Sequence, residues 1–134
     1  MPLKIVCDTN TLISGFLWKG NEFLLLSSVL EGKAVLFLSP VLLQEFARVI
    51  AYPRLKKHVP KPEDLIKTLE SMAVFVSPKE LVAIVEEDPS DDRVLECALA
   101  ADADLIVSGD EHLLKLRKFC GIPVVSTKAA LEKM

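Results

Sequence analysis

Two acidic residues of this sequence stand where a strand is expected to end, a position at which a carboxylate can do chemistry. Asp8 directly follows the apolar run at residues 3–7, and Asp110 comes three residues after the apolar run at residues 105–107. Each aspartate alone could simply cap the helix that follows it. Two strands that both end in an acid beside hydroxyl side chains are more than helix capping alone predicts.

A glutamate lies inside the apolar stripe of a predicted helix at residues 40–50. At 100° per residue, Glu45 falls on the same continuous arc as Leu42 and Val49. An unpaired carboxylate at such a place costs several kcal/mol, so it needs a cation, a network of donors or an open cleft. The alternative is a buried glutamate that forms a salt bridge with an arginine.

Further acidic residues lie in the segment EEDPSDDRVLE at residues 86–96. Asp88 precedes a proline and suits a helix N-cap, which puts Asp91 in the first turn, where a negative charge is favoured by the helix dipole. That explanation needs no function. If one acid of this turn reaches the strand ends, we expect Asp91, which shares a helix face with Leu95, and we expect Asp92 to support it. The sequence leaves open which of the two faces a metal.

Acids from these four places could meet at one edge of a sheet and bind a metal ion there. Two carboxylates about 4 Å apart repel by roughly 4 kcal/mol at an effective dielectric of ~20. Such a group is stable only with shared protons or a divalent cation. Because the ligands are oxygens with no Cys–His set nearby, they favour Mg²⁺ or Mn²⁺ over zinc. The chemistry that suits this site is metal-assisted phosphodiester hydrolysis.

Alternating strands and helices are expected to position these acids. The sequence predicts strands at residues 3–7, 34–38, 74–76, 103–107 and 123–125, and helices at residues 11–18, 21–31, 40–50, 63–72, 89–101, 111–116 and 128–133. Residues 81–85 suit either a strand or a helix. Short strands that are apolar on both faces are typical of a parallel sheet covered by helices. We therefore expect one α/β domain over residues 1–134, with a central parallel sheet of four to five strands, helices on both faces and a site at the carboxyl ends of the strands.

Composition argues against a protein that holds nucleic acid by charge alone, because the net charge is −3. Cys7, Cys97 and Cys120 are an odd number without a close pair, which favours a reducing compartment. The sequence contains no apolar run approaching ~18 residues, so we expect a cytoplasmic protein with no membrane partner. Since 51% of the residues are hydrophobic, some apolar surface is expected to form a subunit interface.

With these residues in hand, the sequence resembles the PIN-domain ribonucleases over essentially its whole length. The matching segments are VCDTNTLISG, SPVLLQEFARVIAYPRL, DPSDDRVLECALAADADLIVSGDEHLL and GIPVVS. It is most similar to the single-domain prokaryotic group described as toxin components of toxin–antitoxin pairs. The resemblance implies Mg²⁺- or Mn²⁺-dependent cleavage of single-stranded RNA on a central parallel sheet, commonly by a homodimer, with an antitoxin protein as a partner.

The resemblance also implies which residues carry the activity. The acidic quartet of the family falls on Asp8, Glu45, Asp91 and Asp110. Asn10 and Ser108 match polar positions that help to hold the site. In this scheme Asp8, Asp91 and Asp110 ligate one or two ions, and Glu45 ligates metal or orients the attacking water.

Contacts with the substrate are less sharply indicated by the sequence. The basic segment at residues 53–62 includes Arg54, Lys56 and Lys57, which either meet the RNA backbone or form a solvated surface. Phe16 and Trp18 could stack on a base, although packing within the protein is the simpler reading. Neither histidine, His58 or His112, has a constellation of catalytic residue types around it, and both are expected at the surface.

Two other functions compete with this interpretation. A structure-specific DNA nuclease would use the same carboxylate chemistry, and only a comparison of DNA with RNA separates the two. A receiver-like signalling module also places an aspartate at a strand end, but it has no use for Glu45 in an apolar stripe. It would also need a lysine after the last strand, where this sequence has Lys128 only at the start of the next helix.

Overall fold

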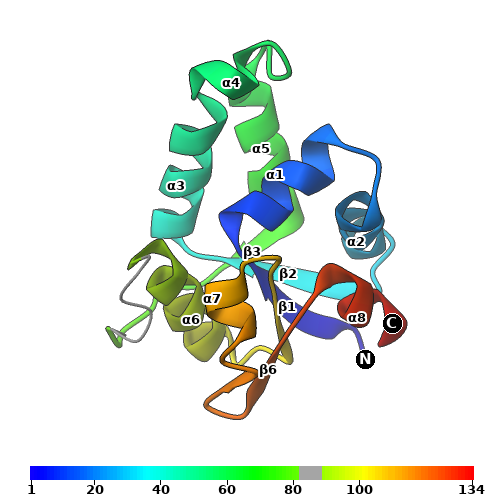
Figure 1. Cartoon of the computed structure of the whole chain (residues 1–134), viewed down its shortest axis with the longest axis vertical. Coiled ribbons are helices and arrows are strands. Elements are labelled where there is room, and N and C mark those ends of the chain that lie inside the picture. The colour runs from blue at the N-terminus through cyan, green and yellow to red at the C-terminus, as the bar shows by residue number, and fades with distance from the viewer. Residues whose placement is uncertain (82–88) are drawn as a thin grey trace.

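The computed structural model of the chain describes residues 1–81 and 89–134. In that part, six strands form one sheet in the order β3-β2-β1-β4-β6-β5 (Figure 1). The strands are β1 Leu3–Cys7, β2 Ala34–Leu38, β3 Ala73–Phe75, β4 Leu105–Val107, β5 Lys118–Phe119 and β6 Ile122–Val125. All neighbouring pairs are parallel except β5 with β6. The central parallel α/β sheet that the sequence predicts is confirmed.

Helices cover both faces of this sheet. They are α1 Thr9–Leu17, α2 Asn21–Leu30, α3 Pro40–Ile50, α4 Pro53–Lys56, α5 Pro62–Met72, α6 Pro89–Ala101, α7 Glu111–Leu114 and α8 Thr127–Glu132. Helix α6 packs on the three strands β1, β2 and β4, whereas α2 packs on β2 and α8 on β4. Helices α3, α4 and α5 lie together at the top of Figure 1, next to α1.

Polar caps start several of these helices directly after a strand. Asp8 accepts a hydrogen bond from the backbone of Thr11 at the start of α1, and Ser39 accepts one from Leu42 at the start of α3. Pro40 occupies the first turn of α3, where its missing N–H costs nothing. These caps fix each helix immediately after the strand, which keeps polar side chains at the carboxyl edge of the sheet.

The structure differs from the sequence prediction mainly in two short elements. The connector at residues 53–62 contains α4, and β5 adds an antiparallel sixth strand to the sheet. Strand β4 begins at Leu105, two residues later than predicted. Most of the ambiguous segment at residues 81–85 lies outside the described residues, as does the predicted cap Asp88.

The core is built from the strands and the inward faces of the helices. Cys7 and Cys97 are fully buried in it, as expected for thiols that pack as small apolar groups, whereas Cys120 is exposed. Burial raises the pKa of the Cys7 thiol far above its usual range and that of Cys97 to about 12, so both stay protonated. In the described part of the chain, no helix has the length and apolarity needed to cross a membrane.

Candidate functional site

The site begins where the two central strands end. Cys7 and Val107 are paired in the register of β1 and β4, so Asp8 and the loop that leads to Asp110 start side by side. The hydroxyl of Ser108 donates to Asp8 Oδ2 at 2.5 Å and accepts from the backbone N–H of Asp110 at 2.9 Å. One buried serine therefore connects the two acids that follow the strands.

Asp8 lies in surroundings that oppose its negative charge. The residue is 6% exposed, and burial raises the pKa of its carboxyl group above the usual value, with a smaller contribution from the charge of Asp110. Hydrogen bonds from Ser108 and Thr11 act in the opposite direction without cancelling the effect of burial. A cation beside this carboxylate would favour its charged form.

Glu45 points from α3 toward the start of α1. Its Oε2 accepts a hydrogen bond from Thr9 Oγ1 at 2.6 Å, and its Oε1 lies 3.5 Å from Arg48 Nη2. The glutamate side chain is 16% exposed. The salt bridge that the sequence offered as an alternative explanation is present, but Glu45 also faces a hollow that it shares with the other acids.

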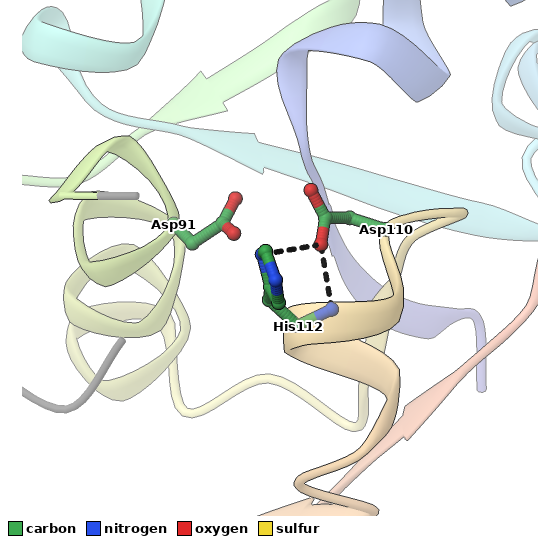
Figure 2. Close-up of side chains that lie close together, drawn as sticks. All are labelled: Asp91, Asp110 and His112. Atoms are coloured by element: carbon green, nitrogen blue, oxygen red, sulfur yellow. Dashed lines mark hydrogen bonds and ion pairs between the residues drawn. The ribbon is translucent and has the colours of Figure 1, made fainter. Parts of the chain in front are cut away.

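Asp91 comes from the first turn of α6 and faces Asp110 across the sheet edge (Figure 2). One ligand atom from each of Asp91, Asp110 and His112 lies within 4.8 Å of the other two. Asp92 is as buried as Asp91, at 5%, but among the described residues it is not part of this group. The geometry thus favours Asp91 over its neighbour as the acid that faces the strand ends.

His112 is a member of this group that the sequence analysis missed. Its side chain is 38% exposed, as expected of a surface residue, but the expectation that no functional residues surround it is wrong. Asp110 caps α7 by accepting the backbone N–H of His112 at 2.7 Å, and this turn brings the imidazole back beside the capping carboxylate. The spacing Asp110-x-His112 at a helix start was the available signal. His58 is exposed, as expected.

The four predicted acids line one hollow of about 210 Å³. Arg48 and Arg54 lie on its wall, together with Thr9 and Asn10. A second hollow, of about 520 Å³, lies on the other side of Asp8 and Asp110 and includes Ser108 and Lys128 in its lining. Asp8, Asn10 and Asp110 belong to both hollows, so these residues form a ridge between them.

Other residues that were considered for substrate contact lie elsewhere. Of the three basic connector residues, Arg54 lines the acidic hollow, whereas Lys56 and Lys57 are not among the described residues that line either hollow. Trp18 packs edge-on against His58 with ring centroids 4.8 Å apart, and Phe16 packs in the same way against Phe46. These aromatic side chains make contacts within the protein, as the simpler reading proposed.

The donor set fits a divalent cation. Four carboxylates and two guanidinium groups line the smaller hollow, which leaves an excess of negative charge. Two ligands of one ion lie about 3.0 to 4.2 Å apart when each is about 2.1 Å from the ion. The spacing of Asp91, Asp110 and His112 is close to that range. Asp91, Asp110 and His112 are therefore spaced so that they could share an ion, and Asp8 and Glu45 line the hollow beside them.

Comparison with known proteins agrees with this geometry. The family model described as PIN domain matches residues 4–112, which is most of the chain. The chain is also similar to the uncharacterized protein MJ1680 of Methanocaldococcus jannaschii, with 29% identity over 121 residues that cover 87% of this chain and 77% of that protein. The matched region contains Asp8, Glu45, Asp91 and Asp110. The chain belongs to the PIN domain family, and this membership indicates a metal-dependent nuclease.

Proposed function

We propose that this protein is an endoribonuclease that cleaves single-stranded RNA with Mg²⁺ or Mn²⁺ as its cofactor. The observation that carries the proposal is the meeting of Asp8, Glu45, Asp91 and Asp110 in one hollow at the carboxyl edge of a parallel sheet. These side chains come from four separate segments of the chain, so a helix cap, a helix dipole or a salt bridge accounts for each one singly but not for their meeting. The PIN domain match supports nuclease chemistry.

In this proposal three aspartates bind the cation, and Glu45 orients the attacking water. Asp8, Asp91 and Asp110 hold the ion, which when bound supplies charge stabilisation at the phosphate and a more acidic water. Glu45 is held by Thr9 and Arg48, and its carboxylate accepts a hydrogen bond from the attacking water and orients it. Ser108 fixes the rotamer of Asp8 through its hydrogen bond.

The two hollows support a single strand as the substrate. A strand that crosses the ridge of Asp8 and Asp110 would place its phosphate at the acids and one flanking nucleotide in each hollow. Arg54 on one side and Lys128 on the other are cations positioned to meet the neighbouring phosphates. Because the net charge is −3, such contacts have to be local.

The resemblance to toxin components extends the proposal to a biological role. We propose that the protein is the toxin of a toxin–antitoxin pair in the cytoplasm, with an antitoxin as its partner. Expression of the wild-type chain should then arrest bacterial growth, and Asp8→Asn should relieve the arrest at equal protein level. Equal arrest by both chains would contradict this role, and so would growth at the normal rate with the wild-type chain.

We also propose a homodimer, which exposed apolar side chains on α2 support. Phe23, Leu24 and Leu30 are large and exposed on this helix, and apolar surface of this kind is usual at subunit interfaces. Sedimentation at micromolar concentration should give twice the monomer mass of 14.8 kDa. Leu24→Glu should reduce that mass, and a wild-type chain that sediments as a monomer would refute the dimer.

DNA is the competing substrate, because the same carboxylates would cleave either backbone. Single-stranded RNA and DNA of the same sequence should be incubated with the protein in Mn²⁺, in Mg²⁺ and in EDTA. The proposal predicts cleavage of RNA in metal and none in EDTA. Cleavage of DNA but not RNA would show that the protein is a DNA nuclease and would contradict the proposal. The PIN domain match supports a nuclease rather than a receiver-like module.

A further inference from the structure

Two groups of His112, its backbone N–H and its imidazole ring, lie near the same oxygen of Asp110. Its backbone N–H donates to Asp110 Oδ1 at 2.7 Å, and its imidazole Nδ1 lies 3.7 Å from that oxygen. The backbone bond is the helix cap of α7 and fixes where the side chain starts. Figure 2 shows the His112 ring between Asp110 and Asp91.

The distance from the ring to Asp110 is informative. At 3.7 Å, Nδ1 and Oδ1 are farther apart than the usual 2.7–3.2 Å of a direct N–H···O hydrogen bond. The distance falls within the range of about 3.0 to 4.2 Å that separates two ligands of one ion. Asp91 contributes a ligand atom that lies within 4.8 Å of one ligand atom from each of the other two side chains. One donor atom from each of the three side chains is therefore near enough to the other two for a single ion to bind all three.

We infer that the imidazole of His112 is a ligand of the bound ion and that the site therefore selects Mn²⁺ over Mg²⁺. This inference rests on the proposed function, since it concerns the same metal site. Mg²⁺ prefers an all-oxygen, near-octahedral set and keeps several waters. An imidazole nitrogen among carboxylates suits a transition metal better.

The histidine content of the chain makes the inference directly testable. The sequence holds two histidines, His58 and His112. His58 is exposed, packs against Trp18 and lies outside the acidic hollow. A ¹⁴N coupling of imidazole type to Mn²⁺ bound at the acids would thus come from His112. His58→Gln is the matched control for His112→Gln.

The experiment is pulsed electron paramagnetic resonance of Mn²⁺ bound to the tag-free full chain in a buffer without nitrogen ligands. We expect a ¹⁴N coupling of imidazole type in the wild type and in His58→Gln, and its loss in His112→Gln. Because the cap uses the backbone N–H, His112→Gln should keep its fold, which circular dichroism checks.

Calorimetry gives the second reading. The Kd for Mn²⁺ should rise about tenfold in His112→Gln, because losing even a residue that only supports a metal ligand weakens metal binding by this factor. The Kd for Mg²⁺ should change little. Mn²⁺ bound without any ¹⁴N coupling in the wild type would overturn the inference and leave His112 as a partner of Asp110 only. No binding of Mn²⁺ or Mg²⁺ by the wild type would instead overturn the metal site and the proposed function with it.

Discussion

Asp8 serves the fold and the proposed chemistry at once, and the two purposes conflict. Its Oδ1 caps α1 through Thr11, and its Oδ2 receives the hydroxyl of Ser108. Burial nevertheless raises the pKa of this carboxyl group, which means that the folded state binds the proton of Asp8 more tightly than the unfolded chain does. The ionised form therefore lowers the stability of the metal-free protein at any pH above that raised pKa.

Asp8→Asn should consequently melt at a higher temperature than the wild type in EDTA at pH 7. Asparagine caps a helix as well as aspartate does, and the substitution removes the buried charge. The difference in Tm should shrink as the pH falls and vanish below about 3.9, the ordinary pKa of aspartate. Added Mn²⁺ should raise the Tm of the wild type only. A lower Tm for Asp8→Asn in EDTA at pH 7 would contradict this account.

Ser108→Ala tests the connection between the two strand-end acids. The substitution removes the hydroxyl donor of Asp8 Oδ2 and the acceptor of the backbone N–H of Asp110, so the free energy of unfolding should fall by about 1–3 kcal/mol. The pKa of Asp8 should rise further, which moves Mn²⁺ binding to higher pH. Urea titration and calorimetry at several pH values measure both effects. Ser27→Ala, at a serine that bonds only its own helix, should change neither.

At the scale of elements, helices α1 and α2 depend on one close approach. A Cβ on Gly15 would lie 2.6 Å from Leu26 Cδ1 and 2.9 Å from the backbone oxygen of Glu22. Gly15→Ala should therefore push the two helices apart and cost about 1–3 kcal/mol of unfolding free energy by urea titration. Gly109→Ala has open space and should be neutral or slightly stabilising. Equal effects of the two substitutions would refute this packing argument.

Elements with long apolar runs or clear caps could be predicted from the sequence, and short elements made by tertiary pairing could not. Strand β1 has an apolar run and helix α3 has a clear cap, and both were predicted at the observed residues. Strand β5 exists because Cys120 and Gly121 adopt positive φ angles of 49° and 81° and close a two-residue hairpin to β6. Cysteine is not a residue that such turns favour, so the hairpin carried no sequence signal.

The prediction of the candidate site included its acids, the supporting residues Asn10 and Ser108, and Arg54 as one of three basic candidates, but not His112. Asp8 and Asp110 follow strands, and Glu45 interrupts an apolar stripe, so each has a signal that sequence periodicity reveals. The place of His112 depends on how the first turn of α7 folds back on Asp110, and the role of Arg54 depends on α4. The spacing Asp110-x-His112 indicates a cap at a helix start, but tertiary geometry decides what the His112 ring and the Arg54 side chain face.

At the scale of the whole molecule, the substrate strand should be held by a few cations beside the acidic ridge. Arg54 lines the acidic hollow, whereas Lys57 belongs to the same connector but not to the described lining of either hollow. Arg54→Ala should raise KM for single-stranded RNA with little change in kcat. The slope of log KM against log salt concentration should be smaller by about 0.7, the value for one phosphate contact on a single strand. If Lys57→Ala changed KM and its salt dependence as much as Arg54→Ala does, the connector would attract RNA only through its overall charge.

The central claim is that the acids of one hollow cleave RNA with a divalent cation, and the adjacent pair Asp91 and Asp92 tests it most directly. Both are 5% exposed on the same helix turn, but Asp91 alone of the two lines the acidic hollow. Cleavage of single-stranded RNA in Mn²⁺ and in EDTA should be compared for Asp91→Asn, Asp92→Asn and the wild type, each shown to be folded. The account predicts Mn²⁺-dependent cleavage by the wild type and by Asp92→Asn, and none by Asp91→Asn. Cleavage by Asp91→Asn at the wild-type rate, or cleavage by the wild type in EDTA, would contradict it.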